Sequence, residues 1–130
     1  LRVKLRYLEE WIERRRAVAA RYLETLSDIP ELTLPSVPEW AEAAWHLFVV
    51  RHPRRDSLQE HLTRSGIDTL IHYPVPPHLS EAYAEEGWKA GDFPTSERLA
   101  NTVLSLPMGP HLKDSLQDEV IERVKQFFNK

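Results

Sequence analysis

The first 26 residues carry apolar side chains at steps of three and four, the spacing of one face of an α-helix. The residues that follow this spacing are Leu5, Leu8, Ile12, Val18, Ala19, Tyr22 and Leu26. Glutamate and arginine fill most of the positions between them, so the opposite face is charged and suited to water. Three prolines between residues 30 and 38 then exclude regular helix. The pattern predicts a long helix over residues 1–26, followed by an extended connection.

Three short runs of β-branched and aromatic residues predict strands, because such side chains suit the pleated surface of a sheet. The runs cover residues 44–51, 67–73 and 102–106. A proline follows each run within two residues and marks its end, since proline cannot continue the ladder of hydrogen bonds. The expected sheet is therefore small.

Further helices are predicted between and after these strands, at residues 57–64, 80–85, 97–100 and 115–128. Gly66 and Gly87 stand where the first two should end, and Pro94 stands in the first turn of the third. Interleaved helices with few, short strands favour an α+β fold over a doubly wound parallel sheet. We expect a small, mostly antiparallel sheet of about three strands packed with helices, and a long N-terminal helix.

Composition limits the classes of protein to which the chain can belong. At 130 residues, 42% hydrophobic and 28% charged, it suits one folded domain over residues 1–130. A formal net charge of −3 provides no basic field for nucleic acid, and no apolar run approaches the roughly 20 residues of a membrane span. The absence of cysteine excludes disulfides and thiolate catalysis and fits a reducing compartment, so we expect a cytoplasmic protein. The chain opens at Leu1, inside a helical pattern and without an initiator methionine, which suggests a piece of a longer protein.

Candidate chemistry concentrates in residues 72–78, with the sequence HYPVPPH. The six histidines lack the close spacing of a metal site, and no glycine-rich phosphate loop or G-x-S-x-G motif is present. His72 and Tyr73 leave a predicted strand into a proline-stiffened loop, which suits groups that must meet a substrate. The alternative is structural: Tyr73 packs at the edge of the core and His72 bonds a backbone carbonyl. From the residues alone both interpretations stand.

Several unrelated motifs in the same order resemble the C-terminal domain of the DegT/DnrJ/EryC1/StrS aminotransferases. They lie at residues 45–51, 58–69, 71–76, 91–100 and 103–108, together with His78, Tyr83, Pro110 and Leu112. The resemblance covers nearly the whole chain, and residues 1–26 are similar to the long helix that connects to this domain in the family. It implies the small C-terminal domain of a fold-type I pyridoxal-phosphate enzyme.

The resemblance also implies an activity for the complete protein. Such enzymes aminate a keto group on a nucleotide-sugar with glutamate or glutamine as donor, for polysaccharide or antibiotic biosynthesis, and act as homodimers; a minority carry out dehydration instead. The family's cofactor lysine lies in a larger N-terminal domain, and none of this chain's lysines has a matching context. They are Lys4, Lys89, Lys113, Lys125 and Lys130. We therefore expect no catalytic, cofactor-binding or metal-binding residue in the chain, and no activity from it in isolation.

The family's His-Tyr-Pro segment lies on the sugar-binding side of its active site. By resemblance, His72 and Tyr73 are the expected substrate contacts, with His78 as a further candidate. The chain departs from the common pattern at Pro77 and Ser80, where the family often has leucine and glutamine. A different class of function also remains open, namely an interaction or ligand-binding domain that keeps the fold without catalysis.

Overall fold

A computed structural model describes residues 1–129 and shows a mixed α+β architecture, as the sequence predicts. Its α-helices are α1 (Arg2–Leu5), α2 (Leu8–Leu26), α3 (Arg55–Arg64), α4 (Pro94–Thr102) and α5 (Asp114–Phe128). Its strands are β1 (Phe48–Arg51) and β2 (Val103–Leu106), and its 3₁₀ helices are η1 (Pro77–Leu79) and η2 (Glu81–Glu86). Over the described residues, no helix is both long and apolar enough to cross a bilayer.

The sheet consists of β1 and β2, which pair antiparallel with Phe48 opposite Leu106. The third strand expected over residues 67–73 is reduced to a single bridge between Leu70 and Ser105. Beyond Leu70 the chain leaves the sheet, and the prolines that follow supply no N–H groups to extend the pairing. The first strand is also shorter than expected, because Trp45 has a left-handed φ of 50° that interrupts an extended run from residue 44.

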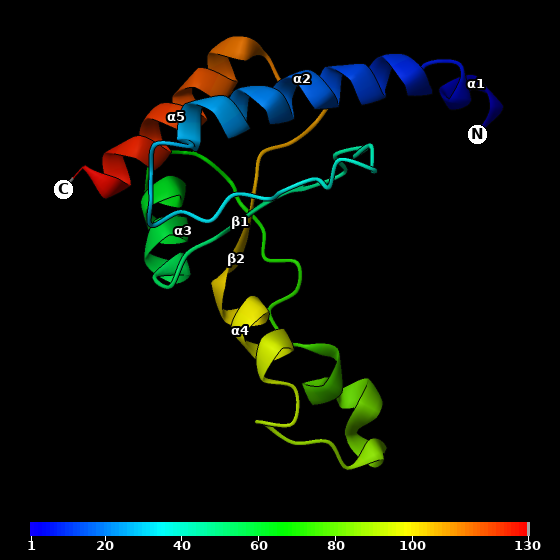
Figure 1. Ribbon diagram of the computed structural model, residues 1–130, viewed down its shortest axis with the longest axis vertical. Coiled ribbons are helices and arrows are strands. Elements are labelled where there is room, and N and C mark those ends of the chain that lie inside the picture. The colour runs from blue at the N-terminus through cyan, green and yellow to red at the C-terminus, as the bar shows by residue number, and fades with distance from the viewer. Residues whose placement is uncertain (130) are drawn as a thin grey trace.

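The core lies where α2, α3 and α5 meet one face of the sheet (Figure 1). Its largest fully buried apolar side chains are Tyr22, Phe48, Leu26, Leu58, Leu62 and Leu104. Each such side chain contributes about 1.5–3 kcal/mol through removal from water. The buried Tyr22 hydroxyl donates to the carbonyl of Pro107 at 3.0 Å, and burial raises the pKa of Tyr22. This hydrogen bond ties the end of β2 to the longest helix.

The helix expected over residues 1–26 is interrupted near its start. Tyr7 takes φ −107° and ψ 1°, which separates α1 from α2. No side chain of α1 is buried, so no packing against the rest of the chain selects a straight helix there. The apolar face of α2 behaves as the spacing predicts, because Val18, Ala19, Tyr22 and Leu26 are buried.

The segment over residues 77–93 forms a projection that points away from α2 and α5 (Figure 1). The helix expected at residues 80–85 is the 3₁₀ helix η2, and Gly87 ends it with φ 75°. Helix α4 begins at Pro94, which lies in its first turn as the sequence predicts, and runs directly into β2. The projection, which carries His78, is therefore linked to the buried strand by one short helix.

Candidate functional site

His72 is held in place by the buried strand β2. Its Nδ1 atom lies 2.9 Å from the hydroxyl oxygen of Ser105, which is only 5% exposed. The backbone of Ser105 also exchanges two hydrogen bonds with Leu70, at 2.8 and 3.3 Å. One strand residue thus fixes both the backbone before His72 and the imidazole itself, and within residues 1–129 no hydrogen bond occupies His72 Nε2. The structural alternative was a hydrogen bond from His72 to a backbone carbonyl. It is wrong for Nδ1, which bonds the side-chain hydroxyl of Ser105 instead.

Tyr73 extends away from the core beside His72. Its side chain is 74% exposed, so the alternative in which it packs at the edge of the core is wrong. The two rings meet edge to face with centroids 5.7 Å apart. Both residues line a cavity of about 210 Å³ whose other walls are mostly apolar, and His72 also borders a cavity of about 430 Å³ with Asp68 and Ser105. An imidazole and a phenol therefore meet at an accessible surface.

His78 lies in the projection, and its partner is Glu97 at the start of α4. The distance from His78 Nε2 to Glu97 Oε1 is 3.1 Å, and the His78 side chain is only 8% exposed. The backbone N–H of Gly91 donates to the same oxygen at 2.8 Å and, with the His78 hydrogen bond, holds the pKa of Glu97 below its ordinary value. Because an ionised carboxylate only accepts hydrogen bonds, Nε2 of His78 carries the proton.

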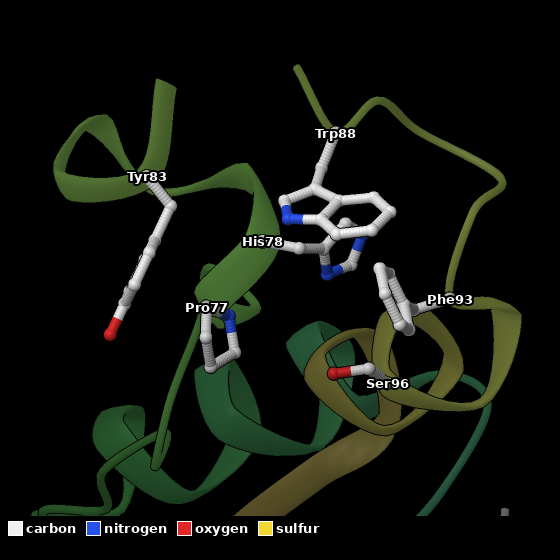
Figure 2. A pocket seen from close by; sticks show the side chains of 6 residues that line it. All are labelled: Pro77, His78, Tyr83, Trp88, Phe93 and Ser96. Carbon is white, nitrogen blue, oxygen red and sulfur yellow. The ribbon is translucent and has the colours of Figure 1, made fainter. Parts of the chain in front are cut away.

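His78 forms one wall of a third cavity of about 310 Å³, which we call the aromatic cavity (Figure 2). It is lined by Pro77, His78, Tyr83, Trp88, Phe93 and Ser96. Figure 2 shows Tyr83 on one side, Trp88 and Phe93 on the other, and Pro77 and Ser96 between them. Pro77 and Ser96 also line the cavity beside His72 and Tyr73, so the two cavities adjoin.

The structure thus places the three residues expected to contact substrate in two adjoining cavities: His72 and Tyr73 line one, and His78 lines the other. Ser105 holds the imidazole of His72, and Glu97 holds that of His78. Neither Ser105 nor Glu97 is among the candidate residues that the sequence provides. In the sequence Ser105 resembles any small strand residue, although a lone hydroxyl in an otherwise apolar strand signals a buried polar contact. Glu97 resembles any carboxylate in the first turn of a helix, and its partner lies 19 residues away, beyond the reach of local spacing.

The lysines do not fit the covalent binding of pyridoxal phosphate, which requires a lysine amine at the site. The four lysines within residues 1–129 are Lys4, Lys89, Lys113 and Lys125. None of them lines the three cavities described above, and Lys125 instead contacts Asp28 at 3.3 Å. Within the same residues, no three histidine, aspartate or glutamate side chains gather as metal ligands.

Several relatives match nearly the whole chain, among them the following two. The erythromycin biosynthesis sensory transduction protein EryC1 of Saccharopolyspora erythraea is 54% identical over 125 residues, which are 96% of this chain and 34% of the relative. A dTDP-3-amino-3,4,6-trideoxy-alpha-D-glucose transaminase of Streptomyces venezuelae is 48% identical over 127 residues, 98% of this chain and 34% of the relative. The chain therefore spans about a third of the length of these relatives.

The fold has a close counterpart among solved structures. The crystal structure of S. venezuelae DesV in complex with a ketimine intermediate matches with a TM-score of 0.96 and 46% identity, over 99% of this chain and 35% of that one. This similarity confirms the fold class expected from the sequence. Residues 1–125 match the sequence model of the family described as "DegT/DnrJ/EryC1/StrS aminotransferase family". The chain belongs to the DegT/DnrJ/EryC1/StrS aminotransferase family.

Proposed function

We propose that this chain is the C-terminal domain, over residues 1–130, of a cytoplasmic, homodimeric aminotransferase that uses pyridoxal phosphate. The enzyme aminates a keto nucleotide-sugar with glutamate or glutamine as donor, for polysaccharide or antibiotic sugar biosynthesis. Residues 1–26 connect this domain to the N-terminal domain, which holds the cofactor. The chain in isolation is inactive, because none of its described lysines lines a cavity of the candidate site.

The observation that carries the proposal is the hydrogen bond between His72 and Ser105, which fixes an imidazole beside the exposed ring of Tyr73. Groups that position a substrate act best when their own freedom is already lost in the fold. Imidazole Nε2 and the phenol hydroxyl are suited to hydrogen-bond the hydroxyls of a sugar. The S. venezuelae relative, named a dTDP-amino-sugar transaminase, supports a nucleotide-sugar as substrate.

In this proposal, pyridoxal phosphate supplies the electron sink for transamination when it is bound by the complete enzyme. The residues of this chain orient the sugar. Ser105 holds His72 so that Nε2 faces the substrate, and Tyr73 adds a second polar contact next to it. His78, fixed by Glu97, contributes from the adjoining cavity.

The test uses the full-length protein and a panel of keto nucleotide-sugars. We expect His72→Asn and Tyr73→Phe each to lower kcat/KM by about 5- to 20-fold, as the loss of one polar contact to substrate. The absorbance of bound cofactor should stay unchanged, because neither residue contacts it in this proposal. Tyr7→Phe, on the exposed surface of the N-terminal segment, is the control. Unchanged kinetics in both site variants would reduce His72 and Tyr73 to structural residues.

A second function has one observation in its favour. The S. erythraea relative bears the name of an erythromycin biosynthesis sensory transduction protein, and sensory transduction is a different class of function from amination. A non-catalytic interaction or ligand-binding domain would keep the fold and bind its ligand without turnover. Cofactor absorbance in the full-length protein, together with amination of any sugar in the panel, would decide for the enzyme; absence of both would decide for the binding domain.

A further inference from the structure

Arg55 is a buried arginine for which the proposed mechanism has no use so far. It is the first residue of α3, and only 7% of its surface is exposed. Burial of a guanidinium is costly unless its N–H groups find acceptors. Its Nη1 donates to the carbonyl oxygens of Ala100 and Val103, at 3.1 and 2.9 Å, and its Nε donates to Asp56 at 2.6 Å. The buried charge therefore joins the start of α3 to the end of α4.

The two carbonyls that accept from Arg55 belong to the junction between α4 and β2. The last turn of a helix leaves carbonyl oxygens without partners inside the helix, and a cation there also meets the negative end of the helix dipole. Arg55 supplies one such partner, to Ala100. The backbone N–H of His52 supplies another, to the carbonyl of Thr102 at 3.0 Å. The end of α4 is thus tied to the core by two residues that follow β1.

The same junction forms a wall of the candidate site. Ala100 and Val103 line the cavity beside His72 and Tyr73. Arg55 itself lines none of the three cavities described above. The guanidinium therefore lies behind this wall and bonds its backbone, so that it acts on a bound ligand only through the position of α4.

Helix α4 also connects this wall to the projection. It lies between β2 and the projection over residues 77–93 (Figure 1). Near its first turn, Glu97 accepts from Nε2 of His78 and from the N–H of Gly91. Because α4 has only nine residues and is continuous, a shift at the end held by Arg55 also moves the end that holds His78.

We propose that Arg55 is a positioning residue of the enzyme, which fixes α4 behind the cavity of His72 and Tyr73 and, through Glu97, fixes His78. The inference rests on the proposed function, because it assigns Arg55 a part in shaping the site for the nucleotide-sugar. Lysine is a poor substitute, since a single ammonium nitrogen cannot reproduce the planar fork that spans the two carbonyls and the Asp56 carboxylate.

The first test measures backbone hydrogen exchange in the full-length protein by mass spectrometry. We expect Arg55→Met, which removes the donors, to speed exchange over residues 91–102 by about 10-fold or more. Arg55→Lys keeps the buried charge and should give a smaller rise in the same segment. Peptides from α2 and α5 should keep their wild-type rates. Arg64→Met is the matched control, because Arg64 lies on the same helix in an exposed pair with Glu60.

Unchanged exchange over residues 91–102 in both Arg55 variants would overturn the proposal. Should Arg55→Met not fold, Arg55→Lys decides: a rise confined to residues 91–102 supports positioning, and an equal rise throughout the domain contradicts it.

The second test measures the kinetics of the full-length enzyme with its nucleotide-sugar. We expect Arg55→Lys to raise KM by about 3- to 10-fold and to leave kcat within about twofold, because the cavity wall shifts while the reacting groups stay. Partial loss of folded protein would instead lower kcat at an unchanged KM, and this result would contradict a positioning role. Hydrogen exchange requires no turnover. If no sugar is aminated, the proposed function fails, while the exchange data still decide whether Arg55 fixes α4.

Discussion

At the scale of single residues, Glu97 joins three parts of the projection. Its carboxylate accepts from the Gly91 N–H and from His78, while its own backbone N–H donates to Phe93. The donors to the carboxylate favour its ionised form, which is why the pKa of the carboxyl is lowered. A carboxyl whose pKa is lowered by folding stabilises the folded state at pH values above its pKa in the unfolded chain, here 4.5. This contribution is lost as the pH falls through the lower pKa of the folded state.

We therefore expect Glu97→Gln to lower the unfolding temperature at pH 7, because the amide accepts hydrogen bonds without a charge. The difference from the wild type should shrink as the pH falls below 4.5 and through the lowered pKa of the folded Glu97 carboxyl, where the wild-type side chain also becomes neutral. Thermal unfolding followed by circular dichroism between pH 3 and 8 checks this. Glu81→Gln, an exposed carboxyl in the same projection, is the control. A difference that does not vary with pH would contradict the assignment.

At the scale of elements, α3 ends at Arg64, and the chain then turns through a left-handed residue, Gly66. Gly66 has φ 78°, and the N–H of Ile67 returns to the carbonyl of Leu62 at 2.9 Å. An added Cβ would meet no atom within 4 Å, so the cost of alanine is conformational rather than steric crowding. We expect Gly66→Ala to lower the free energy of unfolding by about 1–2 kcal/mol. Urea unfolding measures it.

The control for this element is Gly109→Ala. A Cβ added at Gly109 would also meet no atom within 4 Å, but the φ of Gly109 lies outside the left-handed region. This substitution should be neutral or slightly stabilising, since alanine restricts the unfolded chain. Equal losses from both substitutions would show that the backbone conformation of Gly66 is not the cause.

The helices of this protein are predictable from sequence because their signals are local. The apolar spacing of α2 and the glycine after α3 are both visible within a few residues of sequence. The strand expected over residues 67–73 does not form because pairing depends on a partner, and only Leu70 finds one, in Ser105. The break at Tyr7 escapes prediction for a related reason, since it depends on contacts that α1 does not make.

At the scale of the whole molecule, an apolar surface runs along α1 and the start of α2. Its members are Leu1, Val3, Leu5, Tyr7 and Leu8, all more than 40% exposed. Apolar surfaces of this kind drive association. We expect the 130-residue chain by itself to self-associate as its concentration rises. Sedimentation velocity checks this, and Leu5→Lys should shift the chain toward monomer.

Leu116→Lys is the matched control for that prediction, because Leu116 is exposed to a similar degree on α5, away from this surface. A similar shift in both variants would indicate a general effect of charge rather than a specific surface.

The candidate site shows the same division between local and distant signals. His72 and Tyr73 follow from a strand-to-proline motif that a few residues of sequence reveal. Ser105 lies 33 residues from His72, and only the folded chain brings its hydroxyl to the imidazole.

Strand β2 belongs at once to the core and to the candidate site. All four of its residues are buried, and Ser105, between Leu104 and Leu106, bonds His72. A substitution that repacks the core at Leu104 or Leu106 will therefore also re-aim the imidazole. Under the proposed function, stability and substrate choice are therefore linked traits in this domain rather than independent ones. If the proposed function holds, libraries that seek a new sugar should vary β2 together with residues 70–73, because Ser105 of β2 contacts both Leu70 and His72.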